Sequence, residues 1–217
     1  MESKLFTPVT FGPLTLRNRT IRSAAFESMC PGNAPSDMLL DYHRSVAAGG
    51  IGMTTVAYAA VTQSGLSFDR QLWMRPEIIP GLRRLTDAIH AEGAAAGIQL
   101  GHCGNMSHKS ICGCMPVGAS SGFNLYSPTF VRGLRADELP EMARAYGRSV
   151  NLAREAGFDS VEIHAGHGYL ISQFLSPSTN HRKDEFGGSL QNRMRFMDMV
   201  MEEVMKAAGS DKIGRAS

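Results

Sequence analysis

Residues 161–196 read VEIHAGHGYLISQFLSPSTNHRKDEFGGSLQNRMRF, and this stretch places reactive side chains directly after a predicted strand. Its first four residues alternate apolar and polar side chains, as a β-strand does, and the chain then turns at two glycines. His164, His167 and Tyr169 therefore lie where a strand ends. In α/β proteins, sites are built at the carboxyl ends of the strands, so this stretch indicates chemistry.

Strand-like and helix-like segments alternate on both sides of this stretch. After a hairpin, the pattern predicts strands and helices in turn, at 20–25, 36–48, 52–57, 76–92, 94–100, 137–156, 160–164 and 189–208. The residues 212–215 then begin a fifth strand. This alternation predicts an α/β fold with a parallel sheet. An eight-fold (β/α)8 barrel takes about 250 residues, so the chain holds four βα units and the start of a fifth strand.

Composition and charge narrow the class of partner. The hydrophobic content of 43% and the charged content of 19% are ordinary for a globular protein with a substantial core. Lys and Arg number 22 against 20 Asp and Glu, and no basic run is interleaved with aromatic residues, so a nucleic-acid role is not indicated. We expect a small-molecule partner, with assembly into a homo-oligomer left open.

The amino end carries no signal-like segment, and no uninterrupted run of about 18 apolar residues exists to span a bilayer. We therefore expect a cytoplasmic protein without a membrane role. Four cysteines are present, and a core of this size needs no disulfide, so free thiols are expected. The spacing of Cys103, His108, Cys112 and Cys114 does not match a CxxC repeat, and we predict no metal site.

The connection after the third strand, 101–135, is far longer than a usual βα loop. It contains six glycines, two prolines and three cysteines, which favours irregular structure over a long helix. Long loops in compact domains are usually functional, so we predict a lid over a site.

The side chains at the end of the fourth strand suit one reaction. Two imidazoles can donate hydrogen bonds to a single carbonyl oxygen, and a phenol can deliver a proton to a nearby carbon. His164, His167 and Tyr169 would together suit reduction of an activated alkene. Two other interpretations of HxxH stay open, namely a metal-binding pair and a histidine with a structural role.

The segment HAGHGYLISQFLSPSTNHRKDEFGGSLQNRMRF at 164–196 closely resembles the signature of the old yellow enzyme family, which comprises flavin-dependent ene-reductases and their NADH:flavin oxidoreductase relatives. LRNR at 16–19, GIQLGH at 97–102, AREAGFD at 153–159 and Arg215 support the resemblance. It implies a (β/α)8 TIM barrel that holds FMN at the carboxyl ends of its strands. The chain 1–217 would be the amino-terminal part of this single FMN-binding domain.

The resemblance also implies an activity. NADH or NADPH would donate hydride to FMN, and an electron-poor alkene such as an α,β-unsaturated carbonyl would be reduced. By position, His164 and His167 match the pair that binds the substrate carbonyl. Tyr169 matches the catalytic tyrosine that protonates the α carbon.

Several positions match residues that contact the flavin. Gln99 corresponds to an amide on the pyrimidine edge, although a solvated strand residue is the alternative. Arg215 corresponds to an arginine near flavin N1, with a frayed surface cation as the alternative. Tyr58 would lie beside the isoalloxazine, or would simply pack in the core.

The first-strand segment Ser23, Ala24 and Ala25 matches the part of the family that meets the flavin through backbone and small side chains. The sequence departs here from the better-known members, because Phe26 follows in place of a side chain that could hydrogen-bond the flavin. Glu27 is a polar residue to which the sequence assigns no role. The later signature residues, from Asn180 to Arg193, are interpreted as scaffold.

Two other functions remain open at this point. The phosphate-binding loops of the family follow the seventh and eighth strands, so the 217 residues could be a half-barrel without activity of its own, a fragment or an interaction module. Such a chain would retain FMN weakly or not at all. A flavin-linked dehydrogenase or demethylase would share the same barrel and cofactor.

Overall fold

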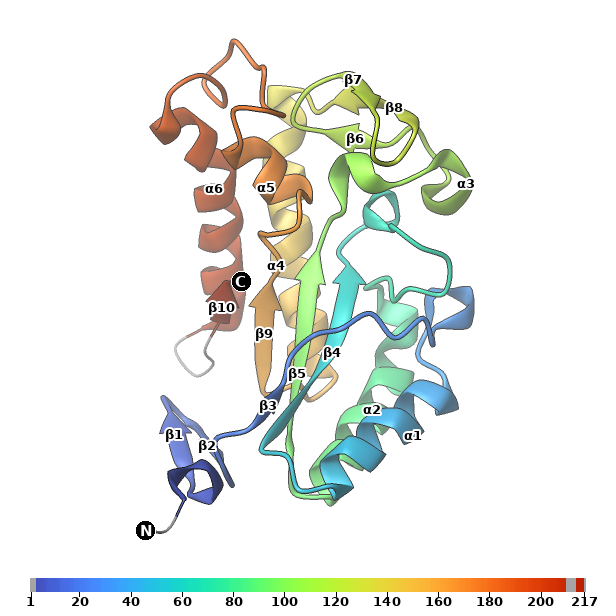
Figure 1. Cartoon of the computed structure of the whole chain (residues 1–217), viewed down its shortest axis with the longest axis vertical. Helices are drawn as coiled ribbons and strands as arrows, with labels where there is room; N and C mark the ends of the chain where they lie inside the picture. The colour runs from blue at the N-terminus through green and yellow to red at the C-terminus, as the bar shows by residue number, and fades with distance from the viewer. Residues whose placement is uncertain (1–2, 210–213, 217) are drawn as a thin grey trace.

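A five-stranded parallel sheet forms the centre of the computed structural model, which describes residues 3–209 and 214–216 (Figure 1). In the order of their places in the sheet the strands are β10 (Gly214–Ala216), β9 (Ser160–Ile163), β5 (Ala95–Gly101), β4 (Met53–Ala60) and β3 (Ile21–Arg22). Every neighbouring pair is parallel. Chain order runs steadily across the sheet, which is the topology of successive βα units in a partial barrel.

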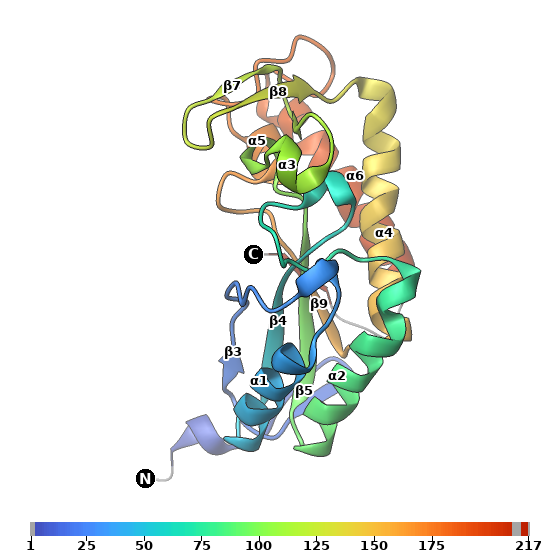
Figure 2. The same cartoon turned by 90° about the vertical axis from the view of Figure 1, so that its right-hand side faces the viewer.

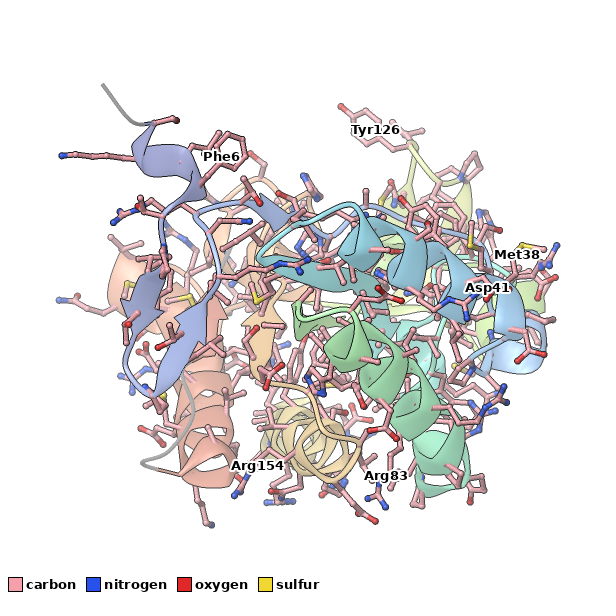
Figure 3. The ribbon with its side chains drawn as sticks, turned by 90° about the horizontal axis from the view of Figure 1, so that it is seen from below. Phe6, Met38, Asp41, Arg83, Tyr126 and Arg154 are labelled. Carbon is pink, nitrogen blue, oxygen red and sulfur yellow. The ribbon has the colours of Figure 1, made fainter. Side chains whose placement is uncertain are left out.

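Four long helices connect these strands and cover one face of the sheet (Figure 2). They are α1 (Asp37–Ala48), α2 (Ile79–Ala91), α4 (Leu139–Glu155) and α6 (Leu190–Ala208). Seen from below, the helices that carry Arg83 and Arg154 lie on one side, whereas Tyr126 projects on the other (Figure 3). The hairpin of β1 (Val9–Phe11) and β2 (Leu14–Leu16) lies near the amino ends of the central strands (Figure 1).

The core lies between the sheet and the helices. On β9, Val161 and Ile163 are buried toward it, while the alternate residue Glu162 is only half-buried. On α6, Phe196 and Val200 are fully buried at a spacing of four residues. Burying one such side chain contributes about 1.5–3 kcal/mol, so the amphipathic pattern holds the helices on one face.

The predicted elements are confirmed with shifted ends. The first strand is limited to Ile21–Arg22, and the second extends to Ala60. The fifth strand covers Gly214–Ala216, while 212 and 213 lie outside the described residues. The helix α5 (Leu170–Leu175) has no counterpart in the prediction, because six residues are too few to show a helical period.

The excursion 101–135 is more ordered than its composition suggests. It contains α3 (Lys109–Cys112), β6 (Val117–Gly118), β7 (Gly122–Asn124) and β8 (Thr129–Gly133). The strand β8 pairs with both β6 and β7, and this small sheet lies beyond the carboxyl ends of the central strands (Figure 1). Its pairs are too short and too rich in glycine to stand out as strands in the sequence.

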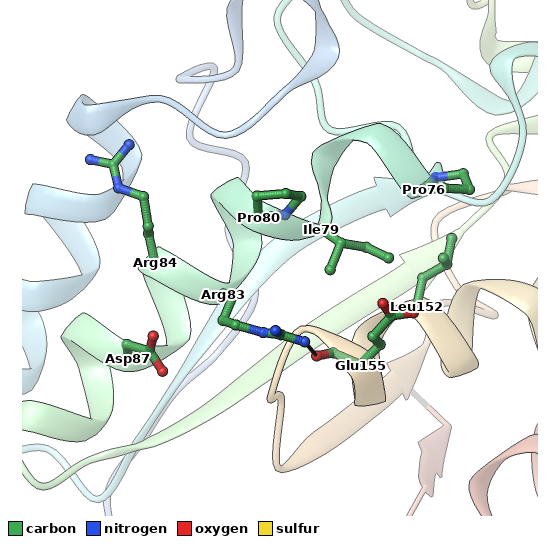
Figure 4. A pocket seen from close by; sticks show the side chains of 8 residues that line it. All are labelled: Pro76, Ile79, Pro80, Arg83, Arg84, Asp87, Leu152 and Glu155. Atoms are coloured by element: carbon green, nitrogen blue, oxygen red, sulfur yellow. Dashed lines mark hydrogen bonds between the residues drawn. The ribbon is translucent and has the colours of Figure 1, made fainter.

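Two hollows of similar size lie on different layers of the molecule, one on the helices and one on the sheet. A groove of about 600 Å³ lies on the helix layer between α2 and α4, where Arg83 donates to the backbone oxygen of Glu155 at 2.6 Å (Figure 4). A second hollow, of about 730 Å³, is lined by the hairpin, by Ser23 directly after β3, and by sheet residues that include Thr55 and Glu162. Only the second lies on the sheet itself. Within the part of the chain that is described, no helix has the length and apolar character to cross a bilayer.

Candidate active site

His164 and His167 meet at the carboxyl end of β9. Nδ1 of His167 and Nε2 of His164 are 3.2 Å apart, so the two rings form a hydrogen bond. His164 is buried, whereas His167 is exposed. His167 adopts a left-handed backbone conformation with φ +54°, and Gly168 follows at +70°. For a residue with a side chain this costs roughly 1 kcal/mol, and it turns the second imidazole back toward the first.

His164 is held in its neutral form. Burial lowers its pKa, and the neighbouring His167 lowers it further. Its Nδ1 is buried and has no hydrogen-bond partner among residues 3–209. A buried unpaired acceptor is tolerated better than a buried unpaired N–H, so we assign the proton to Nε2. That N–H is directed at His167 and can donate to a ligand oxygen placed between the two rings.

Tyr169 lies against the same histidine. Its ring centroid is 4.9 Å from that of His164, in an edge-on arrangement, and 5.1 Å from that of Tyr58. The Tyr169 hydroxyl is 3.4 Å from the hydroxyl oxygen of Ser67. Burial raises the pKa of Tyr169, so the phenol keeps its proton at neutral pH. The sequence-predicted set of two histidines and a tyrosine is thus brought together.

The ring of Tyr58 packs against His164 and Tyr169 in this cluster. It is 7% exposed, and its hydroxyl donates to the backbone oxygen of Gly65 at 2.7 Å. A Cβ added at Gly101 would come within 2.3 Å of the Tyr58 ring and 3.1 Å of the Cβ of His164. The glycine at the end of β5 therefore lets Tyr58 and His164 approach each other. These contacts favour the interpretation of Tyr58 as a packing residue under the site.

Gln99 lies on β5, two residues before Gly101, in a row across the sheet. It is 8% exposed, which contradicts the alternative of a solvated strand residue. Its Nε2 donates to Oε1 of Glu162 at 2.5 Å, and the two residues are in register on adjacent strands. Arg215 in β10 is in register with Glu162 on the next strand. Gln99, Glu162 and the backbone position of Arg215 thus form a single row across three successive strands.

Ser23, Ala24 and Ala25 follow β3, and they are exposed or half-buried with small side chains. Glu27, to which the sequence assigned no role, holds this segment in place. Oε1 of Glu27 is 3.0 Å from Arg22 Nη1 and 3.3 Å from His43 Nε2. The Glu27 carboxylate also accepts from the backbone N–H of Ala57 on β4, at 3.2 Å. A buried ion cluster therefore ties the segment to the second strand.

Two buried glutamines complete the site, and sequence reasoning missed both. Gln173 on α5 donates to the backbone oxygens of Cys103 and Gly168, at 3.2 and 2.6 Å, which joins the histidine turn to the excursion. Gln71 accepts from the backbone N–H of Ser67 at 2.9 Å and donates to the backbone oxygen of Tyr58 at 3.1 Å. Neither residue belongs to a periodic pattern or a spaced motif, so only the fold reveals its contacts.

The later signature residues act as scaffold. Asn180 donates to the backbone oxygens of Phe174 and Phe186, at 2.7 and 2.8 Å. Arg182 pairs with Asp184 at 2.6 Å and also reaches the backbone oxygen of Ala119. These bonds hold the loop that leads into α6, in agreement with the sequence interpretation.

His102, at the end of β5, gives the site region a sensitivity to acid. Nδ1 of His102 accepts from the backbone N–H of Gly104 at 2.9 Å, and Nε2 is 3.1 Å from Ser64 Oγ. Burial lowers its pKa to about 3. Because this is below the ordinary value of about 6.5, the unfolded chain binds the proton more readily, and stability falls as the pH drops below about 6.5.

We expect His102 to account for a loss of about 2 kcal/mol of unfolding free energy when the pH falls from 7.5 to 5. Urea unfolding at a series of pH values measures this loss. In the variant His102→Gln, which cannot titrate, the decline over this range should be shallower by that amount. An unchanged acid slope in His102→Gln would show that His102 is not the group responsible.

Comparison with known proteins gives relatives that are longer than this chain. The 4,4'-dithiodibutanoate disulfide reductase of Rhodococcus erythropolis is 43% identical over 206 residues, which are 95% of this chain and 51% of that protein. The NADPH dehydrogenase of Bacillus subtilis is 37% identical, over 94% of this chain and 60% of its own length. The chain thus spans about half the length of the curated relatives it matches.

Solved structures show the same arrangement of the backbone. The old yellow enzyme homologue from Zymomonas mobilis superposes with a TM-score of 0.90 at 30% identity, over 99% of this chain and 63% of that one. A 2-naphthoyl-CoA reductase gives a TM-score of 0.93 at 28% identity, over 98% of this chain and 35% of that one. The fold is therefore a partial TIM barrel of the old yellow enzyme type.

The family model described as "NADH:flavin oxidoreductase / NADH oxidase family" matches residues 4–216, which is nearly the whole chain. The match includes the β9 end with its two histidines and Tyr169, and it includes the row of Gln99 and Arg215. The chain belongs to the NADH:flavin oxidoreductase / NADH oxidase family.

Proposed function

We propose that the chain forms the substrate-binding part of an FMN-dependent oxidoreductase that takes hydride from NADPH or NADH and reduces an activated alkene. The observation that carries this proposal is the meeting of His164, His167 and Tyr169 at one strand end, with 3.2 Å between the two imidazoles. Such a set can hold the oxygen of an α,β-unsaturated carbonyl and supply a proton beside it.

FMN is the cofactor that family membership implies, and the residues present fit its ring system. Gln99 offers a primary amide, which both donates and accepts, at the carboxyl end of β5. Ser23, Ala24 and Ala25 leave the end of β3 lined by small side chains, which lets a flat ring approach the backbone. The chemistry supplied by bound FMN is the transfer of hydride from the nicotinamide to the acceptor.

The protein's own residues would act on the acceptor oxygen and on one proton. With its proton on Nε2, His164 donates toward the space beside His167. A carbonyl oxygen entering there would replace the mutual hydrogen bond of the rings, with His167 turning its own N–H toward it. Tyr169 keeps its proton because burial raises its pKa, and it can release that proton only to a strongly basic carbon.

The test of this proposal uses the purified chain with FMN in excess, NADPH and 2-cyclohexen-1-one. His164→Ala and His167→Ala should each raise KM for the alkene by about tenfold or more, because each removes a hydrogen bond to the carbonyl. Oxidation of NADPH with ferricyanide as acceptor should change little. The exposed His181 provides a matched control, since His181→Ala should leave both reactions unchanged.

The absorbance of the chain separates this proposal from the half-barrel alternative. Material that stays colourless and oxidises no NADPH at any FMN concentration would contradict an enzyme in this form, and it would favour an interaction module. Normal KM values in both histidine variants, with alkene reduction intact, would contradict the binding role. Nicotinamide reduction driven by an amine substrate would favour the dehydrogenase or demethylase alternative.

A disulfide is the second candidate acceptor, because a relative 43% identical to this chain is a disulfide reductase. The same N–H groups that hold a carbonyl oxygen can stabilise a departing thiolate, and Tyr169 can protonate it. Replacing cyclohexenone by a dialkyl disulfide in the same assay compares the two acceptors. The proposal has three further parts. Residues 1–217 are the amino-terminal part of a single FMN-binding domain, with 101–135 as a lid. The protein is cytoplasmic, and it assembles into a homo-oligomer.

A further inference from the structure

The excursion between β5 and α4 contains two cysteines whose sulfur atoms are in contact. Sγ of Cys112 and Sγ of Cys114 are 3.9 Å apart, and Cys112 donates to the backbone oxygen of Cys114 at 3.2 Å. Cys112 is 2% exposed, while Cys114 is open to solvent. Both are free thiols, as the sequence predicted. The pair thus consists of one accessible sulfur with a second sulfur directly behind it.

The backbone between them brings the sulfurs together. Gly113 ends α3 in a left-handed conformation with φ +75°, and its N–H donates to the backbone oxygen of Lys109 at 2.9 Å. A Cβ at this position would strain the backbone and lie 3.2 Å from Nε2 of Gln63. The turn therefore needs glycine, and it orients both cysteines to the same side.

Two other thiols of the chain provide a contrast. Cys30 and Cys103 are 4% and 0% exposed, and burial raises the pKa of each to about 12. They have neither access to solvent nor an adjacent sulfur within hydrogen-bond contact among residues 3–209. Burial and the adjacent Cys112 raise the pKa of Cys114 as well, while Arg132 on β8 lowers it. Only at Cys114 does the thiol also meet solvent.

We propose that Cys112 and Cys114 form a reactive dithiol site that reduces low-molecular-weight disulfides and closes to an intramolecular disulfide. The Cys114 thiolate attacks one sulfur of the disulfide RSSR, which breaks the S–S bond and releases one RS⁻ that takes up a proton. Cys112 then loses its proton and attacks Sγ of Cys114, which releases the second RSH. Two electrons and two protons pass from the protein to RSSR, giving two RSH.

This site is separate from the flavin-dependent proposal. The reaction needs neither FMN nor a nicotinamide, and it is stoichiometric, with one disulfide consumed per chain. The two sulfurs are 3.9 Å apart, so forming a bond of about 2.05 Å requires them to approach each other by about 2 Å. Failure of the alkene assay would therefore leave this inference intact, and the reverse also holds.

The experiment treats the reduced 217-residue chain with glutathione disulfide at pH 8.5, without FMN, and follows thiols and peptide masses. Free thiols, titrated after unfolding, should fall from four to two per chain. Trypsin cuts after Lys109 and Arg132, so the peptide 110–132 contains both reacting cysteines and no other. This peptide should lose the mass of two hydrogen atoms and should resist alkylation, while Cys30 and Cys103 remain alkylatable.

Variants assign the two steps. Cys112→Ser should stop at a lasting mixed disulfide on Cys114, and Cys114→Ser should not react. Gly113→Ala should slow the second step by roughly fivefold, because the left-handed turn is strained in any residue with a Cβ. Gly122→Ala is the matched control, since it lies exposed in the same excursion with open space around it and should react normally.

Four thiols retained under these conditions would overturn the inference. So would a mixed disulfide that persists in the unaltered chain, or disulfides formed between chains on a non-reducing gel. A mixed disulfide on Cys112 in Cys114→Ser, with none in Cys112→Ser, would contradict the assigned order of attack.

Discussion

Replacing Tyr169 with phenylalanine is expected to lower kcat for alkene reduction by about 10²–10⁴-fold, the usual contribution of a positioned proton donor. Phenylalanine keeps the ring, so the contacts at 4.9 Å with His164 and 5.1 Å with Tyr58 should persist. Only the hydroxyl, 3.4 Å from Ser67 Oγ, is lost. The change therefore removes the hydroxyl that donates the proton and leaves the packing of the ring almost unchanged.

Two measurements separate this role from a structural one. In Tyr169→Phe, oxidation of NADPH with ferricyanide should continue, and KM for the alkene should change less than kcat does. Tyr126→Phe is the matched control, because Tyr126 is 93% exposed and projects away from the helix layer (Figure 3). If Tyr169→Phe reduces cyclohexenone at the normal rate, another group provides the proton.

Removing the Glu27 carboxylate is expected to give the largest loss of stability, about 3–5 kcal/mol in Glu27→Ala. Its side chain is 7% exposed, and those of Arg22 and His43 are 15% and 0% exposed. Deleting it leaves a buried guanidinium without its carboxylate and the Ala57 N–H without its acceptor. A loss of this size is a large share of the stability of a typical domain.

Urea unfolding at pH 7.5 measures the effect. Glu27→Gln keeps an oxygen for the Ala57 N–H but not the charge, so it should fall between the native chain and Glu27→Ala. Glu185→Ala, at an exposed carboxylate, should change the free energy of unfolding by no more than about 0.5 kcal/mol. Equal losses in Glu27→Ala and Glu185→Ala would show that the ion cluster contributes nothing.

The order of strands and helices could be predicted because each long element repeats its own pattern. The helix α6 places Phe196, Val200 and Val204 at intervals of four, and its capping Ser189 marks its start in the sequence. Local patterns of this kind depend only on neighbouring residues. The short elements α5, β6 and β7 escaped prediction, since so few residues show no period.

The active-site residues were predicted from a motif, whereas the residues that hold them in place were not. His164, His167 and Tyr169 are close in sequence, so a turn after a strand suffices to bring them together. Gln71 bonds to Tyr58, whose ring packs on Tyr169. Gln173 joins Gly168 to Cys103, which lies 70 residues before Gln173 in the chain. Glu27 likewise meets His43 and Ala57 only because β3, β4 and α1 pack together. No spacing rule connects such residues before the chain folds.

The sequence by itself determined the alternation of strands and helices, the family signature at 164–196 and the chemical types of the site residues, since these are local properties of the chain. Only the tertiary structure decided that His167 turns back to within 3.2 Å of His164, that Gln99 is buried against Glu162, and that Glu27 is an internal counter-ion. The physical reason is that burial and long-range contacts, which set pKa values and hydrogen-bond partners, arise when distant segments pack.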